Sequence, residues 1–263
     1  MIDFENKLNH GVYDLKKIIQ ILREPGGCPW DCEQTHESIR RNLLEEAYEA
    51  AEAIDLSDTQ LLCEELGDVL MQVVFHADIE EKAGNFTLDT IADRACKKLI
   101  RRHPHVFGST DVKDSNEVIK NWDNIKNEER SHDTTTDEMY SVARSLPALW
   151  RAEKIQKKAA KAGFDWPDYT GALAALYSEL RELEDAVAVG GNVKEELGDL
   201  IFSAVNLARF FDVDPEDSLG QTTDKFIKRF QKVENAARSS KRRLEDMTLE
   251  EMDELYTQAK LEK

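Results

Sequence analysis

Apolar residues recur every three or four positions along most of the chain, the spacing that places them on one face of a helix. The two clearest runs are Leu66, Val69, Leu70, Val73 and Val74, and Leu197, Leu200, Ile201 and Val205. Only 12 glycines and 6 prolines interrupt the 263 residues, so helices can run long. The pattern predicts an all-α protein whose helices pack through these apolar faces.

The sequence repeats itself imperfectly at an offset of about 132 residues. LLEEAYEAAEAI and CEELGDVLMQVVFHA, at 43–54 and 63–77, correspond to YSELRELEDAV and KEELGDLIFSAVNLA, at 177–187 and 194–208. A tryptophan-bearing turn precedes each pair (CPWD at 28–31, GFDW at 163–166), and a basic helix follows it (KKLIRR at 97–102, DKFIKRF at 224–230). Because solenoid repeats are only about 20 to 50 residues long, this offset indicates a duplicated domain.

A polar and charged segment, residues 108–141, separates the two copies. Such a composition is typical of an interdomain linker, and the stretch around Val118–Arg130 has the character of a solvated helix. We therefore expect an N-terminal domain over residues 1–115 and a linker carrying that helix over 116–143. A C-terminal domain should occupy 144–263, and both domains should be helical bundles of the same design.

Capping residues predict that each copy is built on a helical hairpin. In the first copy, Ser57 and Gln60 have the spacing of a capping box at the start of the second helix of the hairpin. In the second copy, Gly190 permits a tight reversal, and Asn192 with Glu195 repeats the cap. The two turns are therefore expected near residues 57 and 190.

Four acidic residues fall opposite one another in each predicted hairpin. They are Glu46, Glu49, Glu65 and Asp68 in the first copy, and Glu179, Glu182, Glu196 and Asp199 in the second. Residues equidistant from the turn of an antiparallel hairpin lie at the same height, and residues three positions apart share a helical face. Each copy should therefore bring two Glu from one helix opposite a Glu and an Asp from the other.

Four carboxylates held this close repel one another, and a divalent cation relieves the repulsion. Carboxylate oxygens without His or Cys suit a hard ion, so we expect Mg²⁺, with Mn²⁺ as a substitute. A di-iron centre would need Glu-x-x-His pairs, which neither EELGD segment contains. Ordinary solvated surface acids are the alternative interpretation of both clusters.

The chain carries 35 Lys and Arg against 53 Asp and Glu, a formal net charge of −18. Such a surface repels nucleic acid polymers and anionic membranes, so we expect neither as a partner. A small phosphorylated ligand is still allowed, because Mg²⁺ commonly keeps positions for substrate phosphates. Lys225, Lys228 and Arg229 share a helical face and are candidates to contact those phosphates, with solvated surface charge as the alternative.

Targeting signals are not evident in the sequence. The first residues lack the basic and apolar regions of a signal peptide, and no stretch approaches about 18 uninterrupted apolar residues. The four cysteines form no CxxC pair of the kind found in zinc sites. We expect a cytoplasmic protein with reduced thiols.

Together these elements resemble the MazG family of nucleoside triphosphate pyrophosphohydrolases in its tandem-domain form. The resemblance runs over nearly the whole chain, from GGCPWDCEQTHESI through RRHPHVF, SLPAL and KIQKKAAKAGFDW to FIKRFQKVE, and the paired ExxE and ExxD signature occurs twice. It implies an all-α enzyme that hydrolyses NTPs or dNTPs to the monophosphate and pyrophosphate with Mg²⁺. It also implies a homodimer whose helices share bundles.

The resemblance further implies roles for individual residues, with the C-terminal copy as the better catalytic candidate. Catalysis and metal binding fall on Glu179, Glu182, Glu196 and Asp199. Phosphate binding falls on residues 225–229, and Tyr256 occupies a position that could stack on the nucleobase, where family members can have Trp. Packing of the last helix is an equal alternative for Tyr256. Independently of the resemblance, Trp30 and Trp166 could border a base pocket, but a Trp after a turn more often covers the end of a bundle.

The expected reaction is attack of water on a phosphorus of the triphosphate. One carboxylate, with Glu179 as the first candidate, would orient or deprotonate that water while the metal polarises phosphoryl oxygens. The sequence shows no Gly-rich phosphate-binding loop of the Walker type. Two other classes stay open: a sensor that binds nucleotide and metal without turnover, and a helical interaction scaffold whose acidic clusters are solvated.

Overall fold

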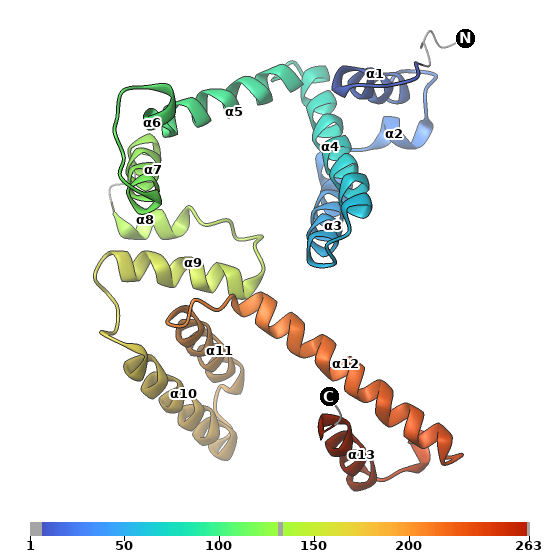
Figure 1. The fold of residues 1–263 in the computed structure, drawn as a ribbon, viewed down its shortest axis with the longest axis vertical. Coiled ribbons are helices and arrows are strands. Elements are labelled where there is room, and N and C mark those ends of the chain that lie inside the picture. Colours follow the sequence, from blue (N-terminus) through green and yellow to red (C-terminus); the bar gives the residue numbers. More distant parts are fainter. Residues whose placement is uncertain (1–6, 131–133, 262–263) are drawn as a thin grey trace. The chain divides into compact units, whose positions relative to one another are not determined.

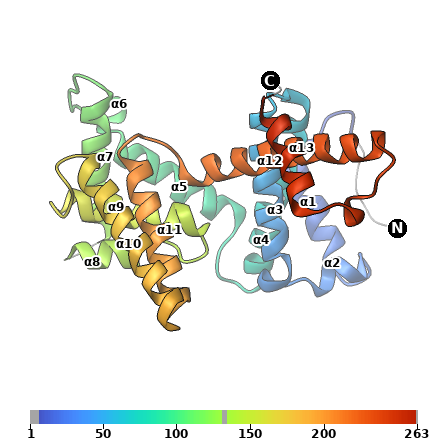
Figure 2. The same ribbon diagram turned by 90° about the horizontal axis from the view of Figure 1, so that it is seen from below.

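The computed structural model describes residues 7–130 and 134–261, and every secondary-structure element in those ranges is helical, which confirms the all-α prediction. The chain divides into two compact units, Met1–Glu129 and Arg130–Lys263 (Figures 1 and 2). The division falls inside the polar segment 116–143. Within the described ranges, no helix is both long enough and apolar enough to span a membrane.

The first unit is built around an antiparallel hairpin of two long helices, α3 and α4. Its helices are α1 (Val12–Leu22), α2 (Pro29–Glu33), α3 (His36–Asp55), α4 (Thr59–Lys82), α5 (Leu88–Arg102), α6 (Pro104–Phe107) and α7 (Ser115–Arg130). Helices α1 and α5 both pack on α4 (Figure 1). The buried core consists of Ile19, Ile39, Val74, Phe75, Ala77 and Leu88, so α4 supplies half of it.

Short polar side chains start both helices of this hairpin. The Thr35 hydroxyl accepts the backbone N–H three residues ahead at the start of α3. At the start of α4, Asp58 Oδ1 accepts the N–H groups of Gln60 and Leu61, at 3.0 and 3.1 Å. The capping role predicted for Ser57 is wrong. Ser57 has a φ of +55° and forms the turn itself, whereas a cap residue needs the extended backbone that Asp58 has.

A buried ion pair joins the end of α1 to the middle of the unit. Arg23 Nε donates to Asp78 Oδ2 at 2.7 Å, and the two side chains are 7% and 1% exposed. Lys82 also reaches Asp78, at 2.9 Å, and the Arg23 guanidinium lies 4.5 Å from the centroid of the Phe75 ring. Arg23 Nη1 donates to the carbonyl of Asp31 at 2.5 Å. One side chain therefore connects α1, α2 and α4.

The helix predicted as solvated, α7, makes contacts at the end of α5. The Arg102 guanidinium forms an ion pair with Glu129 and lies 5.4 Å from the centroid of the Trp122 ring. The His103 ring meets Trp122 edge-on at 4.9 Å. An aromatic residue and an acid on one side of α7 thus dock it against the basic C-terminus of α5, which a purely solvated helix would not do.

The second unit repeats the hairpin with helices α10 and α11, which lie side by side in both views. Its helices are α8 (Thr135–Tyr140), α9 (Ala148–Lys161), α10 (Tyr169–Val189), α11 (Val193–Arg209), α12 (Pro215–Ser239), a 3₁₀ turn (Leu244–Asp246) and α13 (Leu249–Leu261). Gly190 has a φ of +72°, and Asn192 Oδ1 accepts the Glu195 N–H at 3.4 Å. The predicted turn and cap are both confirmed.

The apolar faces of the hairpins are only partly covered within one chain. Val74 and Val205 are buried, as predicted. Leu66, Leu197 and Ile201 were expected on the same packed faces, yet they are exposed, with fractions of 46% for Leu197 and 47% for Ile201. Exposed apolar side chains at helical spacing mark a surface that another element or another chain can cover.

We predict that Asp78→Asn destabilises the first unit by about 3 kcal/mol, because it leaves the Arg23 guanidinium buried without its counter-charge. Denaturant unfolding of the full chain, followed by far-UV circular dichroism, measures the loss. Asp93→Asn is the matched control, since Asp93 belongs to an exposed i, i+4 pair with Lys97 and its removal should leave the midpoint unchanged. Equal midpoints for the two variants would contradict the role given to the buried pair.

Candidate functional site

Three carboxylates converge in the hairpin of the second unit. Glu179 comes from α10, and Glu196 and Asp199 come from the first two turns of α11. Their oxygens, one from each residue, all lie within 4.8 Å of one another. Glu182 is outside this trio and accepts a hydrogen bond from the Ser178 hydroxyl at 3.2 Å. The structure thus brings together three of the four residues predicted for this cluster.

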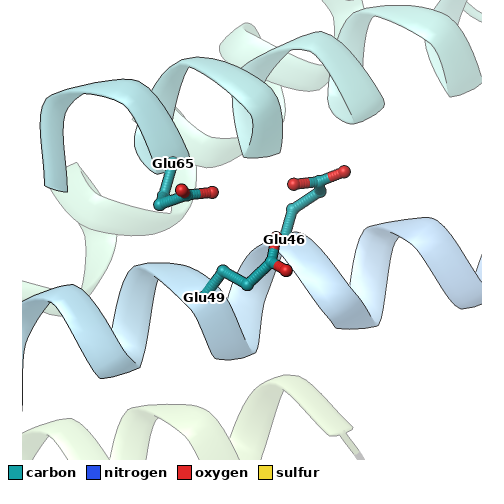
Figure 3. Close-up of side chains that lie close together, drawn as sticks. All are labelled: Glu46, Glu49 and Glu65. Carbon is teal, nitrogen blue, oxygen red and sulfur yellow. The ribbon is translucent and has the colours of Figure 1, made fainter. Parts of the chain in front are cut away.

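The first unit holds a matching trio. Glu65 reaches from α4 toward Glu46 and Glu49 on α3, and the three offer oxygens within 4.8 Å of one another (Figure 3). Asp68 is outside the trio, although its charge acts on Glu46. The excluded residue is therefore an Asp on the second helix here and a Glu on the first helix in the other copy.

The electrostatics of both trios favour proton or cation binding. Burial raises the pKa of the Glu179 carboxyl, and the neighbouring charges of Glu182 and Asp199 raise it further. Burial and then Glu182 likewise raise the pKa of Glu196. In the first unit the pKa of Glu46 is raised by burial and then by Asp68. Each site therefore holds more negative charge than its surroundings stabilise, and carboxylate oxygens alone form a donor set that fits a hard divalent cation.

The predicted phosphate-binding residues lie elsewhere in the second unit. Lys225, Lys228 and Arg229 on α12 line a cavity of about 610 Å³ that also reaches Ala259 of α13. The carboxylate trio does not border this cavity. The cations and the carboxylates therefore do not line this cavity together.

Tyr256 packs within the same pair of helices. Its ring lies 5.6 Å from the ring of Phe226 on α12, and Lys260 Nζ lies 4.9 Å from its centroid. These contacts are those of a residue that packs α13 against α12. They match the alternative given for Tyr256, which is packing of the last helix.

Trp166 borders a different cavity, of about 320 Å³, between α9, α11 and the turn that leads to α10. The cavity is lined by Ile155, Gln156, Ala159, Gly163, Phe164, Asp165, Trp166, Phe202, Asn206 and Arg209. The Trp166 ring is fixed from behind by Gly171, where an added Cβ would lie only 2.7 Å from the indole Cδ2. The residue is 48% exposed, so Trp166 is held in place without being buried.

An ion pair closes one end of this cavity. The Arg209 guanidinium makes a two-pronged contact with Asp165, with Nη1 donating to Oδ2 at 2.9 Å. Arg209 Nε also donates to Asn206 Oδ1 at 3.2 Å. The Arg209 hydrogen bonds hold the pKa of Asp165 below its usual range.

Sequence reasoning missed Gln156, Phe202, Asn206 and Arg209. A usable signal exists for the three on α11, because they follow Asp199 by 3, 7 and 10 positions and so share its helical face. Gln156 lies on α9, and only the packing of α9 on α11 brings it to this place.

Comparison with known proteins supports the family resemblance that the sequence motifs indicate. The family model described as the MazG nucleotide pyrophosphohydrolase domain matches residues 34–107 and 168–234, which contain the two hairpins. A Thermotoga maritima protein named nucleoside triphosphate pyrophosphohydrolase/pyrophosphatase MazG is 42% identical over 247 residues, 94% of each chain. An Escherichia coli nucleoside triphosphate pyrophosphohydrolase is 41% identical over 251 residues, 94% of this chain and 95% of that protein.

The uncharacterized protein YabN of Bacillus subtilis is 44% identical over 259 residues. That alignment covers 97% of this chain but 53% of YabN, so the shared part is one portion of a longer protein. The family model falls on both copies of the repeat, in agreement with two tandem helical domains. The chain therefore belongs to the MazG nucleotide pyrophosphohydrolase family.

Proposed function

We propose that the chain is a Mg²⁺-dependent nucleoside triphosphate pyrophosphohydrolase that converts an NTP or dNTP and water to the monophosphate and pyrophosphate. The observation that carries this proposal is the Glu179, Glu196 and Asp199 trio on a family-typical hairpin, with pKa values raised for two of its members. Relatives named as NTP pyrophosphohydrolases over 94% of the chain support the reaction type.

The carboxylates of the second unit would have separate roles in cation binding and in activation of water. Glu179, Glu196 and Asp199 would hold the cation, and Glu182 would add its charge to the site. Bound Mg²⁺ would polarise phosphoryl oxygens and lower the pKa of water. Glu179 is our candidate to orient or deprotonate the attacking water, because it faces Glu196 and Asp199 from the other helix of the hairpin. Mn²⁺ could replace Mg²⁺ at the same oxygens.

A homodimer would supply the missing cations. Lys225, Lys228 and Arg229 line a cavity that the trio of their own chain does not border, and each is a candidate to neutralise charge on the leaving pyrophosphate. Exposed apolar side chains on α11 (Leu197, Ile201) and α12 (Phe226, Ile227) offer the surfaces for a shared bundle. We propose that the basic face of α12 from one chain meets the carboxylates of the other.

The remaining features fit the same proposal. Tyr256 precedes by three residues Ala259, which lines the basic cavity, and we propose that it meets the nucleotide there once the dimer forms. The first trio, with Glu46, Glu49 and Glu65, would bind a second cation with Asp68 nearby.

We propose the cytoplasm as the compartment of the protein. We propose neither nucleic acid polymers nor membranes as partners, because the net charge of −18 repels both.

A sensor without turnover, or a helical scaffold, is the competing function. A sensor would be stabilised by NTP with Mg²⁺ and form no product, and a scaffold would respond to neither. The same purified protein distinguishes all three when NTPs and dNTPs are incubated with Mg²⁺ and the products are resolved. Monophosphate with pyrophosphate supports the proposal, whereas diphosphate with phosphate would place the attack on another phosphorus.

Glu196→Gln should lower pyrophosphate release by at least about 100-fold, because it removes one of three charges that hold the cation. Glu184→Gln is the matched control, an exposed α10 acid outside the trio that should keep full activity. Glu65→Gln makes the equivalent change in the first copy and shows whether that copy contributes. Full activity in Glu196→Gln would disprove the site assignment.

Addition of Mg²⁺ should raise the melting temperature of the free protein, because a ligand that binds only the folded state stabilises it. EDTA should reverse the shift. Glu179→Gln with Glu196→Gln in one chain should remove the part of the shift that belongs to the second trio, and Glu46→Gln with Glu65→Gln should remove the rest. An Mg²⁺ response unchanged in both double variants would show that neither trio binds the cation.

Co-expression of a Glu196→Gln chain with an Arg229→Ala chain should restore activity that neither variant has alone. Each mixed dimer has one intact site of two, so mixed dimers isolated through two different tags should show about half of wild-type activity per chain. The measurement is pyrophosphate release per chain after purification through two different tags. Activity no higher than the mean of the two variants would mean that each chain uses its own α12.

A further inference from the structure

We infer that the cavity beside Trp166 holds the nucleobase of the triphosphate, and that the side-chain carbonyl of Gln156 accepts a hydrogen bond from an N–H group on the edge of that base. The inference rests on the proposed function, since it assigns the base-binding part of the same site. It gives a role to Gln156, which lies in the KIQKKAAKAGFDW motif but had no function assigned from the sequence.

The cavity lies in line with the carboxylates along α11. Phe202 and Asn206 share the helical face of Asp199 and lie about 4.5 and about 10 Å farther along the axis, at about 1.5 Å per residue. A phosphate chain held at Asp199 therefore has room for a ribose before a base reaches the cavity. The volume of about 320 Å³ is at the lower end of the range for small-ligand sites.

Gln156 has one satisfied and one unsatisfied polar atom. Its side chain is buried, with 7% of the residue exposed, and Nε2 donates to the carbonyl of Phe202 at 2.8 Å. Because a carbonyl can only accept, this bond fixes which end of the amide is Oε1. Oε1 is buried and has no hydrogen-bond partner among the described residues, although a buried carbonyl normally has one. A ligand with an N–H donor would supply it.

The rest of the lining selects a flat, uncharged group. Trp166 and Phe202 present partly exposed ring faces, on which a base can stack. Arg209 is already engaged by Asp165 and Asn206, so it offers no free charge to a phosphate. A phosphate would also meet the Gln156 oxygen, which repels it, whereas a base edge presents the donor that this oxygen lacks.

In the first copy a buried aromatic side chain occupies the position that corresponds to Asn206 of the cavity wall. Phe75 follows Glu65 by ten residues, as Asn206 follows Glu196. Phe75 is buried in the core with the Arg23 guanidinium over its ring, whereas Asn206 lines the cavity. The duplication therefore replaced a core aromatic residue by a polar wall residue in the copy that we propose as catalytic, or the reverse.

Gln156→Met should raise the KM for ATP, GTP, CTP or UTP, whichever the enzyme uses best, by about tenfold or more with little change in kcat. Methionine keeps the volume and removes the acceptor. The inhibition constant of inorganic tripolyphosphate, which has no base, should stay unchanged. Gln72→Met is the matched control, since Gln72 is also buried with an unpartnered Oε1 but lies on α4 of the first unit.

The outcomes separate a base contact from a structural role. An unchanged KM in Gln156→Met, or an equal loss for tripolyphosphate, would overturn the inference, as would the same loss in Gln72→Met. Asn206→Phe is the second variant, placing in the cavity the residue that the first copy carries. It should raise the nucleotide KM while leaving tripolyphosphate inhibition intact, and it keeps the inference testable where Gln156→Met folds poorly.

A failure of the proposed function is distinguished by a binding experiment without turnover. Adenosine, guanosine, cytidine and uridine are titrated into the full chain by calorimetry, with no metal or phosphate present. Saturable binding of a nucleoside that Asn206→Phe abolishes supports the base site even where no triphosphate is hydrolysed. Absence of binding to the unmodified protein at millimolar nucleoside overturns it, whatever the activity.

Discussion

The antiparallel register of the hairpin is the constraint on which the site depends. Glu179 meets Glu196 and Asp199 because the chain reverses at Gly190 and α11 starts at Asn192. A turn longer by one residue would rotate every α11 side chain by about 100° and separate the carboxylates. The fold thus spends stability to keep like charges close, as the raised pKa values of Glu179 and Glu196 show. Such an arrangement is useful only with a counter-charge, and the same logic holds for Glu46 and Glu65 in the first unit.

Most of the hairpin was predictable from the sequence because its signals are local. The spacing of apolar residues, the glycine at 190 and the acids symmetric about each turn required no knowledge of tertiary packing. The two predictions about the hairpins that differ from the structure, the cap at Ser57 and the place of Glu182, also concern local features. Ser57 and Asp58 are both capping residues by type, and only the backbone angle at Ser57 decides between them. Likewise, register placed four acids in each cluster, but rotamers decide that Glu182 turns to Ser178.

The cavity beside Trp166 and the position of α12 could not be predicted from local sequence signals. Gln156 approaches Phe202 across 46 positions of sequence, through the packing of α9 on α11. Helix α12 is amphipathic along its whole length, so its sequence fits contact with its own hairpin or with another chain. The structure shows α13 on α12 and leaves Phe226 and Ile227 half exposed. A sequence shows which face is apolar, whereas the partner that covers it is a matter of assembly.

The two copies tether the tryptophan-bearing turn in the same way with the charges exchanged. Asp78 follows Glu65 by thirteen residues, as Arg209 follows Glu196, and each forms an ion pair with the preceding turn region, through Arg23 or Asp165. Attraction depends on the product of two charges, so the exchange preserves the tether. The exchange does change the space around the ion pair. In the first unit the long Arg23 side chain lies over the Phe75 ring, whereas in the second unit a cavity lies beside the short Asp165 and Trp166. The exchange of charges therefore accompanies a local difference between the copies: Phe75 fills the equivalent point of the first unit, whereas a cavity lies beside Trp166 in the second.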